Sequence, residues 1–204
     1  MPSTAEIIAR LRQQAEPFSR FTVGIAGPPG SGKSTIAEEL REALVQAGEC
    51  AVIVPMDGFH FDDAILNARG DRARKGAPHT FDVAGFEALL KRIKAHEADI
   101  AIPVFDRSME LARAGAEIIP AEAKFILIEG NYLLLDQAPW NRLKPYFDFT
   151  IFLDVNETEL ERRLIARWLG FGFDESGAKE KALGNDIPNA NLVMNSSAKA
   201  DLVI

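Results

Sequence analysis

The stretch Gly27-Pro28-Pro29-Gly30-Ser31-Gly32-Lys33-Ser34 decides the fold of this chain. It matches the pattern G-x-x-x-x-G-K-[ST] at every position, follows the apolar run Phe21–Ala26 and precedes a helical pattern that starts at Ile36. Glycines let such a loop wrap a phosphate with its backbone N–H groups pointing inward. The following helix N-terminus adds partial positive charge. A chance glycine-rich turn would rarely combine these positions with this setting, so the loop predicts nucleoside triphosphate binding.

The residue types of this loop assign individual roles. Lys33 supplies a mobile cation for the outer phosphates, and the Ser34 hydroxyl reaches Mg²⁺. ATP and Mg²⁺ are therefore the expected cofactors. The predicted nucleotide contacts are Gly27, Pro28, Pro29, Gly30, Ser31, Gly32, Lys33, Ser34 and Thr35.

Apolar runs alternate with helical patterns along the rest of the chain. Helical spacing of apolar residues recurs at 36–47, 86–93 and 160–168. The runs are continuous, which is typical of parallel strands covered on both faces. They are Phe21–Ala26, Ala51–Pro55, Ile100–Val104, Phe125–Ile128 and Phe149–Leu153. We expect one α/β domain over 1–204 with a mainly parallel sheet and helices on both faces.

Two segments depart from this alternation. Asn67–Thr80 is rich in Arg, Lys, Gly and Pro and has no apolar period, which predicts an exposed loop. Its basic residues could draw an anionic substrate or product toward the site. A solvated loop is the favoured interpretation. Ile102–Phe105 and Glu117–Ile119 flank a polar stretch and predict a protruding hairpin.

Composition excludes several classes of partner. The 204 residues carry 23 Lys and Arg against 30 Asp and Glu, a net charge of −7, which disfavours binding to nucleic acid or to an anionic membrane. The single cysteine excludes an internal disulfide. No apolar run approaches the roughly 18 residues of a membrane span. We expect a cytoplasmic protein with a small-molecule partner, and the sequence leaves a homodimer open.

Two carboxylates follow predicted strands. Asp57 comes just after Ala51–Pro55, at the strand end where ligands of parallel sheets bind, so it is a candidate to take a proton from an attacking hydroxyl. Its alternative role is a helix cap. Glu129 follows four apolar residues in a Walker-B arrangement, which predicts contact with Mg²⁺ directly or through water. A solvated loop carboxylate is the alternative for Glu129.

Other nucleotide-binding classes fit less well. Asp82–Gly85 matches the short D-x-x-G motif of GTPases, but Asp82 starts a helix instead of following an apolar strand, and no N-K-x-D is present to recognise guanine. A motor is disfavoured because the chain is short and lacks a second ATPase module. A non-catalytic ATP-binding regulatory protein stays open, and it differs from a kinase in forming no phosphorylated product.

Four stretches together resemble the P-loop small-molecule kinases, the group that includes uridine kinase, bacterial pantothenate kinase and phosphoribulokinase. They are Gly27–Thr35, Met56–His60, Gly76–Asp82 and Ile128–Tyr132. Within that group the chain most resembles the bacterial fructose transport system kinases, or nucleoside/nucleotide kinase-like proteins. The resemblance covers the chain from about Phe21 onward. It implies ATP-dependent phosphorylation of a small-molecule alcohol by a five-stranded parallel P-loop NTPase fold with a substrate hairpin near 102–120 and a lid near 162–175.

The resemblance also implies roles for single residues. Asp57 would activate the acceptor hydroxyl, and Arg163 and Arg167 of the lid would approach the phosphates. Their spacing of four places both arginines on one helix face, and guanidinium groups suit a transferring phosphoryl group. The predicted acceptor contacts are Asp57, His79, Asp82, Asp106 and Arg107, and Asn195 and Ser197 are expected near the adenine.

The hairpin departs from the pattern of the uridine kinases. Those enzymes carry a Tyr-Asp and a following His-Ser-Arg, whereas the corresponding stretch here, 105–110, has neither the Tyr nor the His. Uridine recognition is therefore disfavoured, while Asp106 and Arg107 still suit a polyhydroxylated or anionic acceptor. A sugar such as fructose is the first candidate, with nucleoside and pantothenate-like acceptors behind it.

Overall fold

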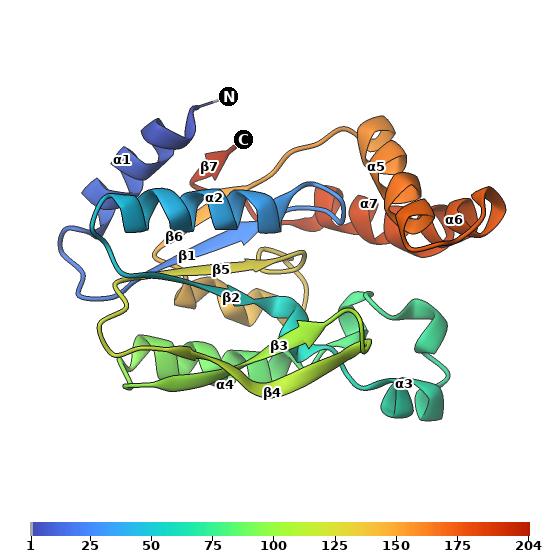
Figure 1. Ribbon diagram of the computed structural model, residues 1–204, viewed down its shortest axis with the longest axis horizontal. Coiled ribbons are helices and arrows are strands. Elements are labelled where there is room, and N and C mark those ends of the chain that lie inside the picture. The colour runs from blue at the N-terminus through green and yellow to red at the C-terminus, as the bar shows by residue number, and fades with distance from the viewer. Residues whose placement is uncertain (1) are drawn as a thin grey trace.

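The computed structural model describes residues 2–204 and is built around a five-stranded parallel sheet (Figure 1). The strand order is β2-β5-β1-β6-β7. The strands are β1 (Phe21–Ala26), β2 (Ala51–Pro55), β5 (Phe125–Gly130), β6 (Phe149–Phe152) and β7 (Leu202–Val203). Every residue of β1 and β5 is buried, as expected of continuous apolar runs at the centre of a covered sheet.

Helices cover the sheet on both faces, and each face has its own core. Helices α1 (Thr4–Ala15) and α2 (Lys33–Gln46) pack on one face, and α4 (Val83–Lys94) packs on the other (Figure 1). Successive residues of β5 alternate between the two cores: Phe125 and Leu127 join α1 and α2, whereas Ile126 and Ile128 join α4. The period of two along the strand is thus what divides one apolar run between two layers.

Two further units flank the carboxyl edge of the sheet. Strands β3 (Ile100–Asp106) and β4 (Leu111–Ile119) form an antiparallel hairpin that crosses Gly58, where a Cβ atom would collide with the Pro103 carbonyl. The other unit is helical (Figure 1). It consists of α5 (Glu157–Gly170), α6 (Glu175–Lys181), a π-helix (Ala182–Asp186) and α7 (Ile187–Ser196). The short helix α3 (Asp63–Arg69) follows a 3-10 turn at Met56–Phe59.

The structure confirms several local predictions. The strands at Phe21–Ala26 and Ala51–Pro55 have the expected bounds. Asp82 begins α4 as expected and caps it by accepting from the Gly85 N–H. Asn156 caps α5 in the same way, by accepting from the Glu159 N–H. These predictions hold because caps and strands depend on neighbouring residues in the sequence.

Two segment predictions are wrong. Ile100–Val104 does not join the parallel sheet but forms part of the hairpin, and Leu202–Val203 supplies the fifth strand. Ile100 and Ile102 are buried while the intervening Ala101 is exposed, so only one face of β3 is covered. The segment 67–80 is not simply an exposed loop, because Ala77 and Thr80 are buried.

Within residues 2–204, no helix is both long and apolar enough to traverse a bilayer.

Arg20 is a buried cation that joins the sheet to its flanking loops. Its side chain donates to the carbonyl oxygens of Ala123, Ile93, Glu97 and Ala121, at 3.1–3.3 Å. Only 3% of the residue is exposed. A guanidinium can satisfy this many acceptors at once, which lets the segments before β1, after α4 and before β5 meet without unpaired carbonyls.

We predict that Arg20→Met lowers the free energy of unfolding by about 2–3 kcal/mol, because it leaves several buried carbonyls without a donor. Arg92→Met is the matched control, since Arg92 is exposed and pairs only with Glu97. Its loss should cost less than about 1 kcal/mol. Urea unfolding measures both, and equal losses in the two variants would contradict this role of Arg20.

Candidate functional site

The loop 27–32 joins β1 directly to the N-terminus of α2. Gly30 and Gly32 have φ values of +80° and +98°, a region in which residues with a side chain are strained. Helix α2 begins at Lys33, the next residue. The Lys33 Nζ atom donates to the Pro28 carbonyl at 2.9 Å. The loop thus combines a tight turn, a helix N-terminus and a lysine held against its own backbone, an arrangement that suits a polyanion.

Lys33, at the start of α2, and Glu129, near the end of β5, are buried charged groups at the same edge of the sheet. Burial lowers the pKa of Lys33 to about 8, although Glu129 and Asp57 favour its charged form. Burial also raises the pKa of Glu129; Asp57 raises it further and Lys33 opposes the rise. Glu129 lies in β5, opposite Ile25 of β1 and Pro55 of β2. Three adjacent strands therefore bring one cation and two carboxylates to the same edge of the sheet.

The donor set at this edge fits Mg²⁺. Ser34 is among the groups that lower the pKa of Glu129, so a hydroxyl and a carboxylate lie near each other beside the loop. Mg²⁺ prefers such hard oxygen ligands and is usually bound by one or two carboxylates together with substrate phosphates. Residues 2–204 contain no cluster of three or more His, Cys, Asp or Glu side chains that could hold a metal ion.

A cavity of about 520 Å³ opens beside Asp57 and reaches Pro29 of the loop 27–32, which we call the phosphate loop. Five aromatic side chains and eight charged ones contribute to its walls, which suits a small molecule with both apolar and polar parts. The aromatic ones are Phe81, Phe105, Trp168, Phe171 and Phe173, and the charged ones are Asp57, Arg72, Lys75, Arg107, Glu110, Arg167, Lys181 and Asp186.

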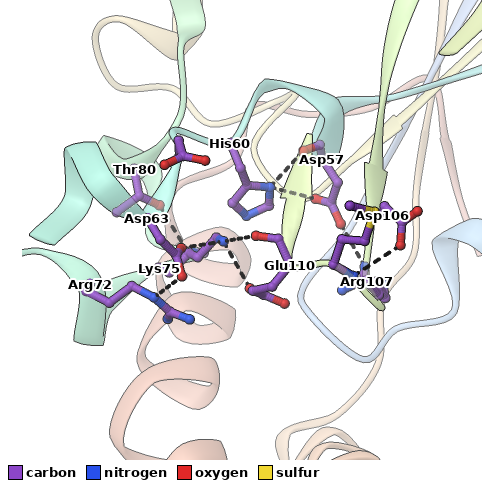
Figure 2. Close-up of polar contacts among 12 residues, drawn as sticks. Asp57, His60, Asp63, Arg72, Lys75, Thr80, Asp106, Arg107 and Glu110 are labelled. Atoms are coloured by element: carbon purple, nitrogen blue, oxygen red, sulfur yellow. Dashed lines mark hydrogen bonds and ion pairs between the residues drawn. The ribbon is translucent and has the colours of Figure 1, made fainter. Parts of the chain in front are cut away.

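Asp57 is held from two sides. The Arg107 Nη2 atom of the hairpin lies 2.8 Å from its Oδ2 atom, and the His60 Nδ1 atom lies 2.8 Å from its carbonyl oxygen (Figure 2). Burial lowers the pKa of His60, so its ring is neutral near pH 7 and Nδ1–H donates to that carbonyl. The side chain of Asp57 is 25% exposed and forms part of the cavity wall. It is therefore accessible to an acceptor.

The two predicted arginines of α5 both lie at the site. Arg163 Nη1 is 3.3 Å from the carbonyl oxygens of Gly30 and Ser31, so it rests on the phosphate loop. Arg167 lines the cavity and pairs with Asp186 at 2.9 Å. Its neighbour Trp168 donates Nε1–H to the same carboxylate at 2.7 Å. Asp186 of the π-helix thus fixes both side chains at the edge of the cavity.

Other predicted residues lie outside this cavity. His79 and Asp82 line a second cavity of about 600 Å³, and Asp82 is occupied as the cap of α4. Asp106 accepts from the backbone N–H groups of Ser108 and Met109 within the hairpin turn. Asn195 is exposed, and Ser197 forms a bridge with Leu135. The proposed contacts of these five residues with acceptor or adenine stay predictions.

Sequence reasoning missed Lys75 and Asp186 as site residues. Lys75 belongs to the segment predicted to be solvated, yet its side chain is only 7% exposed. The signal that could have found it is its position directly before Gly76–Asp82, one of the stretches that carry the family resemblance. Asp186 has no comparable signal, because its partners Arg167 and Trp168 come from a different helix.

Comparisons with known proteins identify relatives of this chain over most of its length. The model of the "Phosphoribulokinase / Uridine kinase family" matches residues 22–204. A crystal structure of a "putative fructose transport system kinase" from Silicibacter sp. TM1040 is 40% identical, with a TM-score of 0.96 over 100% of both chains. The protein YggC of Escherichia coli is 34% identical over 94% of this chain and 80% of its own. A "putative uridine kinase" of Schizosaccharomyces pombe is 31% identical over 91% and 83%.

We predict a pH-dependent cost of burying the charge of Lys33. Because burial lowers its pKa to about 8, the unfolded chain holds this proton more tightly, so the cost is full below pH 8 and is relieved as the pH rises toward the ordinary lysine value. Between pH 7 and pH 10, wild type should gain about 2–3 kcal/mol of unfolding free energy relative to Lys33→Met. Urea unfolding at both pH values tests this, and a constant difference would contradict it.

Proposed function

The chain belongs to the phosphoribulokinase / uridine kinase family, and we propose that it transfers the γ-phosphoryl group of ATP, with Mg²⁺, to a hydroxyl of a small molecule. As a family member it is an ATP-dependent small-molecule kinase. The observation that carries the proposal is the position of Asp57. Its carboxylate lies at the edge of the sheet that holds Lys33 and Glu129, and it also lines the cavity that reaches the phosphate loop.

Different residues of the site have different roles in the proposed phosphoryl transfer. The loop 27–34 cradles the phosphates with its backbone N–H groups, and Ser34 and Glu129 would hold Mg²⁺. Bound Mg²⁺ neutralises phosphate charge and orients the triphosphate. Asp57 accepts the proton of the acceptor hydroxyl as its oxygen attacks the γ-phosphorus, and ADP leaves. Lys33, Arg163 and Arg167 offset the charge on the transferring group.

The acceptor that we place first is a sugar such as fructose. The 40% identical protein from Silicibacter sp. TM1040 is described as a "putative fructose transport system kinase", and the cavity beside Asp57 offers charged groups for hydroxyls. A nucleoside is the second candidate. The aromatic rings of Phe81, Phe105 and Trp168 in the cavity walls would suit a base, and the relative from Schizosaccharomyces pombe is described as a "putative uridine kinase". Pantothenate-like acceptors come third.

An ADP-release screen over sugars, nucleosides and pantothenate tests the proposal, with product identified by mass spectrometry. We expect one acceptor class to give ADP and an equal amount of phosphorylated product. If Mg·ATP binds but no acceptor is phosphorylated, the chain is better explained as a non-catalytic ATP-binding protein.

For the acceptor so identified, we predict that Asp57→Asn lowers kcat by about 10²–10⁴-fold, because the amide cannot take the acceptor proton. The dissociation constant for Mg·ATP should stay close to that of wild type. Asp136→Asn, at an exposed carboxylate outside the cavity, is the matched control and should leave kcat unchanged. Unchanged turnover in Asp57→Asn would remove Asp57 as the base.

A further inference from the structure

Lys75 is a buried cation that joins two parts of the cavity wall. Its Nζ atom lies 2.7 Å from Asp63 Oδ1 on α3 and 3.0 Å from Glu110 Oε1 in the hairpin turn (Figure 2). It also donates to the Glu110 carbonyl at 2.9 Å and lies 5.0 Å from the ring centroid of Phe105. The side chain is only 7% exposed. Because its three donors have three oxygen partners, this is a built site and not a solvated lysine.

The backbone that carries Lys75 is anchored independently of its side chain. The Lys75 carbonyl accepts from Asn185 Nδ2 at 2.9 Å, and Arg74 Nη1 donates to the Gly184 carbonyl at 3.0 Å. Both partners belong to the π-helix. The Gly76 carbonyl accepts from the Tyr132 hydroxyl at 2.6 Å. These contacts fix the backbone of the segment 74–76. The Lys75 side chain can therefore hold the hairpin turn that contains Glu110.

The hairpin turn that Lys75 contacts has an unfavourable backbone conformation at Glu110. Glu110 has φ = +54°, a left-handed conformation that is unfavourable for a residue with a side chain. Glycine would adopt it freely, and the same hairpin does use a glycine, Gly115, at φ = +61°. The turn is exposed, with Met109 at 60% and the Glu110 side chain at 49%. The contacts of both the carboxylate and the carbonyl of Glu110 with Lys75 supply a physical reason for a charged residue at this position.

The same turn carries Arg107 to Asp57. Arg107 and Glu110 are three residues apart, and both line the cavity. The Arg107 side chain is 63% exposed, and its ion pair with Asp57 is part of the cavity wall. Surface ion pairs of this kind fix a long side chain only weakly. The position of Arg107 therefore depends on where the turn is held.

We propose that Lys75 is a positioning residue that, through its ion pair with Glu110, holds the hairpin turn against α3 and so keeps Arg107 beside Asp57. This inference rests on the proposed function in one respect, that the cavity is the acceptor site. The positions of the turn, of Arg107 and of Lys75 follow from the contacts themselves. A purely structural ion pair would contribute to overall stability without setting the position of the turn.

Distances between spin labels test the proposal without an acceptor. Cysteines introduced at Met109 in the turn and at Asn67 on α3, both exposed, carry the labels in a Cys50→Ser background. Wild type should give one narrow distance distribution. Lys75→Met and Glu110→Gln should each lower the ratio of docked to displaced turn about tenfold, which corresponds to loss of one partly buried charged contact. The double variant should go no further, and Lys75→Arg should restore the docked population.

Two more variants separate positioning from stability. Glu110→Gly relieves the left-handed conformation, so its unfolding free energy in urea should not fall, yet its turn should be displaced as in Glu110→Gln. Glu117→Gln removes the same charge from exposed β4 and should keep the wild-type distance.

A wild-type distance distribution in both Glu110→Gln and Glu110→Gly would overturn the proposal, even if Lys75→Met failed to fold. If the turn is displaced while the acceptor screen finds no product, the ion pair still sets the turn and only the assignment of the cavity is lost.

Discussion

The candidate site depends on keeping the charge of Lys33 in a place that water hardly reaches. A buried ammonium is costly, and here the cost is limited by the Pro28 carbonyl and by the nearby carboxylates of Glu129 and Asp57. The same burial makes the group useful, because an electrostatic interaction in a low dielectric is stronger than in water. A triphosphate with its metal would bring opposite charges to this edge of the sheet. The features that strain the folded chain are thus the ones that suit it for its ligand.

The topology of the sheet places these groups together. Strands β2, β5 and β1 are neighbours and parallel, so their carboxyl ends present Asp57, Glu129 and the phosphate loop along one edge. The hairpin and the helices from α5 to α7 then supply side chains that no strand end could provide. Arg107 comes from the first unit, and Arg163 and Arg167 come from the second. The central edge is set by the sheet, and the walls are set by the flanking units.

The sequence predicts the central edge better than the walls. A strand, a glycine loop and a helix that follow one another are encoded locally, as are the caps Asp82 and Asn156. The apolar run at Ile100–Val104 does not reveal whether one or both of its faces are covered. The role of Lys75 depends on Asp63 and Glu110, which are 12 and 35 residues away along the chain. Such pairings arise from tertiary structure, which composition and spacing do not contain.

Calorimetry of Mg·ATP binding tests the central claim most directly, because it requires no knowledge of the acceptor. Mg·ATP titrated into wild type should give saturable heat at one site per chain, and Lys33→Ala should weaken that binding at least about tenfold through loss of a charged contact to the phosphates. Glu117→Gln should bind as wild type does. Absence of heat from wild type, or equal affinity in wild type and Lys33→Ala, would contradict the account of this edge as a triphosphate site.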